Sequence, residues 1–379
     1  MSVLTRGKDE VPLGYMVQLD GLRCVAVIAV MFEHFFPANV RLDVVWGRLG
    51  VRLFFVLSGF LITGILLKCK QHADQGRQTH LYSARQFYIR RFLRIIPLYY
   101  ASIVVMSVLG PPEVANSALW HFAYLSNVYA ALPLHEAGIT SHFWSLAVEE
   151  QFYFLWPWLI LFVPWRILPA VMGIACVIGP VYRFCGVALG WNHATTQWLT
   201  PACLDTLGLG SLLAYLVIAG HLSREELRKW AIRALLLGAP ILIYAYSRPA
   251  SHPFLVTMGD VGCGLTFSCL IYFAAIGQNG YLGRILRWFP VVYLGKISYG
   301  IYIVHFFVPY LYRAFLMPLG LPDVARLNGN ISALIYVALT ILLAACSWRF
   351  YEGPLNQLKH FFSYHKNELS GHPNPATYR

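Results

Sequence analysis

Apolar runs of membrane-spanning length follow one another along the chain, and shorter polar segments separate them. A helix needs about 20 mainly apolar residues to cross a bilayer, so each run predicts one transmembrane helix. Two runs also hold ionisable residues: the first contains Arg23, Glu33 and His34, and the fourth contains Glu149 and Glu150. We expect an all-α, polytopic integral membrane protein of about ten spans. The expected spans cover roughly residues 21–36, 48–67, 92–110, 144–163, 167–187, 203–219, 232–247, 258–277, 291–315 and 331–350.

The composition excludes two broad classes of protein. Hydrophobic residues make up 58% of the 379 residues, charged residues make up 12%, and the mean hydropathy is +0.57. A soluble globular chain is about 25% charged, so this chain cannot cover the surface of a soluble enzyme of its size. Its many aliphatic and aromatic residues exclude a disordered chain. The eight cysteines form no C-x-x-C pair and no metal-ligand spacing, so we expect neither disulfides nor a metal site.

The distribution of lysine and arginine predicts the orientation. Segment 68–94 carries seven of these residues, whereas 111–143 and 188–202 carry none. Cytoplasmic loops of membrane proteins collect positive charge, and this also explains the net charge of +12 without a nucleic-acid partner. We therefore expect both termini in the cytoplasm. Within the uncharged side, segment 117–132 predicts a re-entrant or interfacial element.

The chain shows no linker, internal repeat or low-complexity tract, so we expect one transmembrane domain. It would cover residues 1–353, and residues 354–379 would form a short cytoplasmic tail.

Arg23 and His34, eleven residues apart, form the most informative pair in the first run. At about 100° per residue they share one helix face, separated by about 16 Å along the axis. The face thus carries a fixed cation near the cytoplasmic end and an imidazole towards the other end. Histidine is well suited to proton transfer near neutral pH, so His34 is a candidate acid–base catalyst. The alternative is an imidazole that only binds a neighbouring helix.

Glu149 and Glu150 are adjacent carboxylates inside the fourth run. They point about 100° apart on a helix, so at least one must face the bundle rather than lipid. One of them is a candidate partner that orients His34, as a carboxylate does in a catalytic triad. The alternative is a structural ion pair with an arginine such as Arg23 or Arg52.

Two further clusters have both a functional and a structural interpretation. Arg91 and Arg94 share one face of a cytoplasmic helix start, where they suit bidentate phosphate binding or simple anchoring of the helix. Ser298, Tyr302 and His305 form a polar stripe at i, i+4 and i+7. This stripe is a candidate cavity lining, or it joins two helices by hydrogen bonds.

Five motifs in order resemble the acyltransferase 3 family of membrane O-acyltransferases. They extend over nearly the whole chain, from about residue 16 to 353. The motifs are LDGLR at 19–23 followed by His34 (R-x10-H), GVRLFFVLSGFLI at 50–62, RFLRIIP at 91–97, WSLAVEEQFY at 144–153 and SYGIYIVH at 298–305.

The resemblance implies a bacterial inner-membrane enzyme. It would move an acyl group, usually acetyl, from cytoplasmic acyl-CoA to a hydroxyl of a surface or secreted glycan, or of a lipid-linked sugar. Some members acylate small molecules such as macrolides. Acyl-CoA would be a co-substrate, and no cofactor would be bound permanently. Many members carry a C-terminal SGNH-type domain; we expect this chain to be a stand-alone form.

Residue roles follow from the resemblance together with the charges. On the donor side, Arg91 and Arg94 would bind the CoA phosphates, and Arg23 would steer the thioester arm or pair with a phosphate.

On the acceptor side, His34 would be the general base for the hydroxyl or would carry the acyl group transiently. Glu149 or Glu150 would orient the imidazole or favour its charged form. Ser298 and Tyr299 are candidate oxyanion donors, and Tyr299 joins the candidate cavity lining.

Two other classes fit part of the pattern. A transporter or flippase of a lipid-linked glycan also has many helices with buried charges, but no inverted repeat is detectable. Another membrane O-acyltransferase fold uses an Asn/His pair, and His121 and Asn127 fall in one segment without further support.

Overall fold

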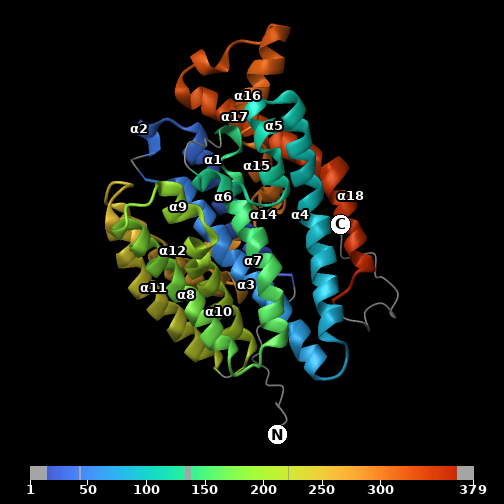
Figure 1. The fold of residues 1–379 in the computed structure, drawn as a ribbon, viewed down its shortest axis with the longest axis vertical. Helices are drawn as coiled ribbons and strands as arrows, with labels where there is room; N and C mark the ends of the chain where they lie inside the picture. The colour runs from blue at the N-terminus through green and yellow to red at the C-terminus, as the bar shows by residue number, and fades with distance from the viewer. Residues whose placement is uncertain (1–14, 42–43, 133–137, 221, 365–379) are drawn as a thin grey trace.

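The computed structural model describes residues 15–41, 44–132, 138–220 and 222–364 (Figure 1). Within these ranges the chain forms helices joined by turns and has no strand, which confirms the all-α prediction. Nine helices correspond to nine of the expected spans. They are α1 (Val17–Phe35), α3 (Trp46–Asp74), α4 (His80–Leu109), α7 (Phe143–Phe162), α8 (Leu168–Ala188), α10 (Leu204–Ile218), α11 (Arg224–Tyr246), α12 (Pro253–Ala275) and α17 (Gly329–Ser347).

The remaining expected span, 291–315, is a series of short helices. It consists of α14 (Phe289–Lys296), α15 (Ser298–Val304) and α16 (Val308–Leu311). The segments Ser298–Val304 and Val308–Leu319 meet at an angle of 56°. Pro309, near the start of α16, lacks the backbone N–H that would continue the preceding turn.

Among the described residues, seven helices are long and apolar enough to cross a membrane, or eight if the bent pair is one span. This supports a multi-pass membrane protein, while the number of ten spans stays a prediction. The charged side chains of Asp20, Arg23 and Glu33 account for the absence of α1 from this set. These side chains lower the apolarity of a helix whose length otherwise suits a bilayer.

Helix α3 lies at the centre of the bundle, where it packs against α1, α4, α7, α10 and α12 (Figure 1). Small residues allow its close approach to α10. A Cβ added to Gly59 would collide with the backbone oxygen of Leu207, and one added to Gly210 would collide with that of Val56. The glycines at these two positions therefore allow close helix packing.

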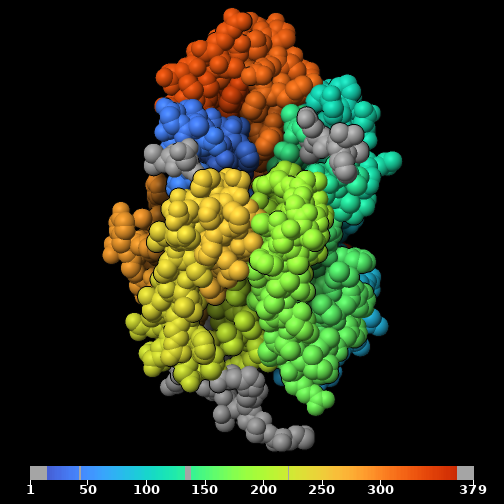
Figure 2. All heavy atoms as spheres, turned by 60° about the vertical axis from the view of Figure 1, so that its left-hand side comes forward, coloured from blue at the N-terminus to red at the C-terminus, as the bar shows by residue number. Residues whose placement is uncertain are grey.

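Helices α8 and α11 contribute much of the outer apolar surface. In Figure 2, α8 in green lies beside α11 and α12 in yellow, and the orange segment beyond residue 300 gathers at one end. The exposed side chains of α8 and α11 include Ile174, Phe184, Leu236, Leu237 and Ile243. An apolar surface this extensive suits contact with lipid rather than with water.

Two connecting regions were also expected from the sequence. Segment 117–132 falls on α5 (Pro112–Phe122) and α6 (Ser126–Ala131), which are too short to cross a bilayer, and α5 packs against α4. The expected tail begins at α18 (Gly353–Gln357), after which Arg90 of α4 donates hydrogen bonds to backbone carbonyls of the tail. Residues 365–379 of that tail lie outside the described residues.

Candidate active site

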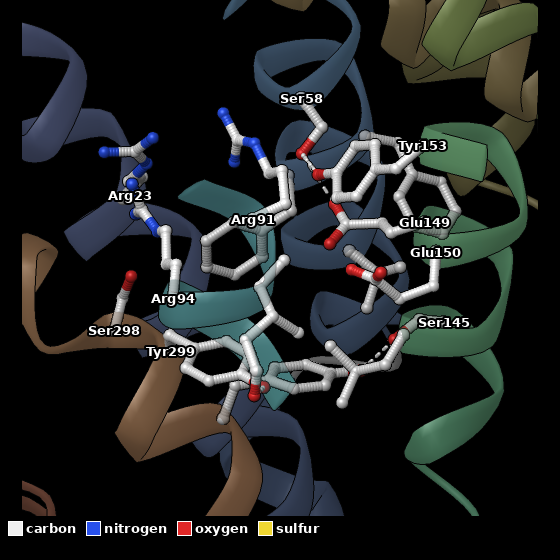
Figure 3. A pocket seen from close by; sticks show the side chains of 16 residues that line it. Arg23, Ser58, Arg91, Arg94, Ser145, Glu149, Glu150, Tyr153, Ser298 and Tyr299 are labelled. Carbon is white, nitrogen blue, oxygen red and sulfur yellow. Dashed lines mark hydrogen bonds between the residues drawn. The ribbon is translucent and has the colours of Figure 1, made fainter. Parts of the chain in front are cut away.

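Helices α1, α3, α4, α7 and α15 enclose a polar cavity of about 720 Å³, which we call the arginine pocket (Figure 3). Residues from four of the five sequence motifs line this pocket, and Arg23 of the first motif lies beside them. Its polar lining residues are Arg23, Ser58, Arg91, Arg94, Ser145, Glu149, Glu150, Tyr153, Ser298, Tyr299 and Tyr302.

The three guanidinium groups lie on one side of this pocket, opposite the two glutamates (Figure 3). Arg23 forms an ion pair of 2.6 Å with Asp20. Arg91 lies over the ring of Tyr153, 5.5 Å from its centroid, and forms no ion pair with a described carboxylate. Arg94 likewise has no ion pair or hydrogen bond to any residue that the structure describes. The pocket therefore keeps guanidinium groups available for an anionic ligand such as a phosphate.

Glu149 accepts the last hydrogen bond of a chain that begins at Tyr153, on the same helix α7. Tyr153 donates to the Ser58 hydroxyl over 2.9 Å, and Ser58 donates to Glu149 over 2.6 Å. Glu150 has a buried carboxylate oxygen without a hydrogen-bond partner in the described chain. Both glutamates thus lie in the arginine pocket, where they can accept hydrogen bonds from a ligand.

The residues of α15 close the other side of the arginine pocket. The Tyr299 hydroxyl donates to the Ile95 carbonyl over 2.7 Å, whereas the Ser298 hydroxyl has no hydrogen bond among the described residues. The hydroxyls of Tyr302 and Ser145 share a hydrogen bond of 2.5 Å. Tyr302 is therefore held rigidly across the pocket, from α15 to α7.

A second cavity, the histidine pocket, occupies about 900 Å³ beyond Tyr302. His34 and His142 line it, together with Glu33, Arg48, Arg52, Trp144, His193 and Gln197. Partial burial lowers the pKa of His193, and the guanidinium groups of Arg48 and Arg52 add to this effect. Val51 and Tyr302 line both pockets, so these two side chains form the wall between them.

The spacing of Arg23 and His34 predicts that both lie on one helix face, and the structure places them at different pockets. Arg23 lines the arginine pocket and His34 lines the histidine pocket. The side chain that hydrogen-bonds to His34 is His305, at 3.3 Å, rather than a glutamate. His305 lines neither pocket and lies fully buried behind His34.

Sequence reasoning did not single out a buried ion-pair network beside the histidine pocket. Asp260 of α12 contacts Arg52 at 2.7 Å, Arg48 at 2.9 Å and Arg183 at 3.4 Å. Arg183 of α8 also pairs with Asp205 of α10 at 2.6 Å. The network joins four helices. Arg52 pairs with Asp260 in this network, and not with Glu149 or Glu150 as the structural alternative had suggested. Lone charges inside the expected spans 167–187, 203–219 and 258–277 were the signal that could have revealed it.

Comparisons with known proteins agree with this architecture. The family model described as an acyltransferase domain matches residues 16–350. The chain is 31% identical over 381 residues to the peptidoglycan O-acetyltransferase of Listeria monocytogenes, covering 93% of this chain and 57% of the relative. It is also 31% identical over 369 residues to a putative peptidoglycan O-acetyltransferase of Bacillus subtilis, covering 90% of this chain and 55% of the relative.

A putative O-acetyltransferase of Staphylococcus aureus is 26% identical over 387 residues, covering 90% of this chain and 58% of the relative. The chain thus spans less than two thirds of the length of these relatives. No solved structure matches it. The match of the family model over residues 16–350 shows that this chain belongs to the acyltransferase 3 family.

Proposed function

We propose that this chain is a membrane O-acyltransferase that moves an acyl group, specifically acetyl, from acyl-CoA to a hydroxyl of an exported glycan or lipid-linked sugar. The observation that carries this proposal is the pair of polar pockets that meet at Val51 and Tyr302. One pocket holds guanidinium groups without carboxylate partners, and the other exposes an imidazole. The names of the relatives, which are O-acetyltransferases of peptidoglycan, support an acetyl group and a glycan acceptor.

The proposed topology has ten spans in a bacterial inner membrane, with both termini in the cytoplasm. The bent series α14–α16 counts as one span, and α1 and α7 cross the membrane because their charged residues face the pockets rather than lipid. The cation-rich segment 68–94 then lies at the cytoplasmic side, next to the arginine pocket. Residues 1–353 form the transmembrane domain, and 354–379 form the tail.

In this arrangement the arginine pocket receives the donor from the cytoplasm. Arg91 and Arg94 bind the CoA phosphates, because planar guanidinium groups bind phosphate oxygens in pairs. Arg23 steers the thioester arm towards the wall at Tyr302. Acyl-CoA is a substrate here, and the acceptor reaches His34 from the histidine pocket on the opposite side.

The chemical step requires that a proton leave the acceptor hydroxyl. His34 takes this proton while the hydroxyl oxygen attacks the thioester carbonyl carbon, the carbon–sulfur bond breaks, and the CoA thiolate receives the proton from the imidazolium. In the alternative sequence, a His34 nitrogen attacks the thioester carbonyl carbon, the carbon–sulfur bond breaks, and CoA leaves as a thiolate. The acceptor hydroxyl oxygen then attacks the acyl carbon, the carbon–nitrogen bond to His34 breaks, and the hydroxyl proton passes to the thiolate. Glu149 and Glu150 lie on the donor side of the wall, where they can accept hydrogen bonds from the donor. Ser298 is the proposed oxyanion donor.

The proposal is tested with purified protein in vesicles that contain a glycan oligosaccharide, with radiolabelled acetyl-CoA supplied outside. We expect acetyl transfer by the wild-type protein and a loss of at least about 100-fold for His34→Ala, because a general base contributes about 10²–10⁴-fold. Wild-type turnover by His34→Ala would refute the assignment. Translocation of a lipid-linked glycan without consumption of acetyl-CoA would instead favour the flippase class.

A further inference from the structure

His34 and His305 form a part-buried imidazole pair at the back of the histidine pocket. The Nδ1 atom of His34 and the Nε2 atom of His305 are 3.3 Å apart, and the two ring centroids are 5.1 Å apart. His34 keeps an exposed surface towards the pocket, whereas His305 is fully buried. One imidazole therefore faces the reactants, and the other contacts it from behind.

The position of the protons in this pair follows from the second nitrogen of His305. Its Nδ1 atom lies 2.6 Å from the backbone carbonyl oxygen of Tyr302. A carbonyl oxygen only accepts, so His305 must carry a proton on Nδ1. A neutral His305 then has a bare lone pair on Nε2, and the hydrogen of the shared bond must belong to Nδ1 of His34.

The opposite arrangement requires a doubly protonated His305. That form would place a positive charge in a fully buried site that no described carboxylate contacts. Burial of an unpaired charge is strongly unfavourable, so the neutral arrangement is the stable one.

We infer that His305 is a positioning residue that holds His34 in the Nδ1-protonated tautomer and leaves the lone pair of Nε2 free for the histidine pocket. This inference rests on the proposed function, in which His34 acts as a base or as an acyl carrier. Both actions need a bare imidazole nitrogen on the exposed side of the ring. A neutral histidine in water prefers its proton on Nε2, so the contact with His305 shifts His34 to the Nδ1-protonated tautomer.

The surrounding aromatic rings hold the pair in place. The Phe306 ring lies 4.5 Å from the His34 ring centroid, at 62° to it. The other side of Phe306 stacks on His142 at 4.9 Å and 2°. His305 and Phe306 lie at the 56° bend that follows α15.

Two substitutions at His305 separate positioning from simple packing. In His305→Leu the side chain keeps an apolar volume but offers no acceptor to His34. In His305→Gln the amide oxygen takes the place of Nε2 and accepts the same hydrogen. We expect kcat to fall about 100-fold in the leucine variant and to stay within about tenfold of wild type in the glutamine variant. The KM for acetyl-CoA should not change, because the wall at Tyr302 separates the two pockets.

His121→Leu is the matched control. His121 is also a fully buried histidine, and it bonds to serines near α5 and lines neither pocket. We expect the kcat of the correctly folded His121→Leu protein to equal that of the wild type. Wild-type kcat in His305→Leu, or equal losses in the leucine and glutamine variants, would overturn the inference. A loss that affects only the KM for acetyl-CoA would overturn it as well.

The tautomer itself is measured by ¹⁵N NMR on histidine-labelled protein, with the His34 signals assigned by their absence in His34→Ala. We expect a protonated Nδ1 and an imine-type Nε2 in the wild-type protein, and a protonated Nε2 in His305→Leu. A protonated Nε2 in the wild-type protein would refute the inference without any reference to activity. If instead His34→Ala retains full acetyl transfer while the tautomer is as expected, the proposed function fails and the positioning contact stands.

Discussion

Removal of the two unpaired arginines from the arginine pocket should weaken binding of the donor without weakening the fold. A hydrogen bond to a charged group contributes about 1.5–3 kcal/mol. Since 1.4 kcal/mol corresponds to a factor of ten in Kd, loss of Arg91 or Arg94 should cost about 10–100-fold in affinity for CoA. The two side chains would share one ligand, so their losses need not add. We expect the double alanine variant to bind CoA at least about 100-fold more weakly.

The structure indicates that this change leaves the fold intact. Neither arginine forms an ion pair with a described carboxylate, so their removal leaves no buried partner charge behind. The main contact that the fold loses is that of Arg91 over the rings of Phe87 and Tyr153, at 5.6 and 5.5 Å. Such contacts contribute about 0.5–1 kcal/mol each at exposed sites.

The measurement is calorimetric titration of CoA into the detergent-solubilised protein, together with its thermal midpoint. Arg85→Ala is the matched control, because Arg85 is an exposed cation on the same helix that does not line the pocket. This control removes one positive charge and should leave the Kd unchanged. An unchanged Kd in the double variant would refute the reasoning and would leave Arg91 and Arg94 as topological anchors only. An equal loss of affinity in Arg85→Ala would show that general charge, rather than the pocket, attracts the ligand.

Three further results are expected. Asp260→Ala should lower the free energy of unfolding by about 3–5 kcal/mol, because it leaves the buried guanidinium groups of Arg52 and Arg183 and the partly buried one of Arg48 with only one remaining carboxylate. Thermal or denaturant unfolding measures this, and an unchanged midpoint would contradict it. Tyr302→Ala should join the two pockets and raise the hydrolysis of acetyl-CoA in the absence of acceptor, whereas Tyr302→Phe should not; equal hydrolysis in all three proteins would argue against the wall. A cysteine at Glu113 should react with an impermeant maleimide only from outside the cell, and one at Arg77 only from the cytoplasm, above the background of the native cysteines; the reverse pattern would overturn the proposed orientation.

The sequence was sufficient to predict the helical architecture because each helix is encoded locally by an apolar run. It also predicted that Arg23 and His34 share one helix face, since helical periodicity alone determines this. It could not predict that Tyr302 separates them, because that residue comes from a distant helix and closes the space between two pockets. The pairing of His34 with His305 depends in the same way on the bend after α15.

The ion-pair network shows a second limit of sequence reasoning. Asp260, Asp205 and Arg183 each stand alone within an apolar segment, and nothing local indicates their partners. Only the packing of α8, α10 and α12 around α3 brings the charges together. A lone charge in an expected span therefore predicts that a partner exists, but the identity of that partner needs the three-dimensional arrangement.

The wall at Val51 and Tyr302 has a consequence for the energy supply of the cell. An open aqueous passage through a bilayer would conduct protons and dissipate the electrochemical gradient. Tyr302, which shares a hydrogen bond with the Ser145 hydroxyl, and Val51 line both pockets, so their side chains would separate water in one pocket from water in the other. Under the proposed function, the membrane therefore stays electrically insulated where acetyl groups cross it.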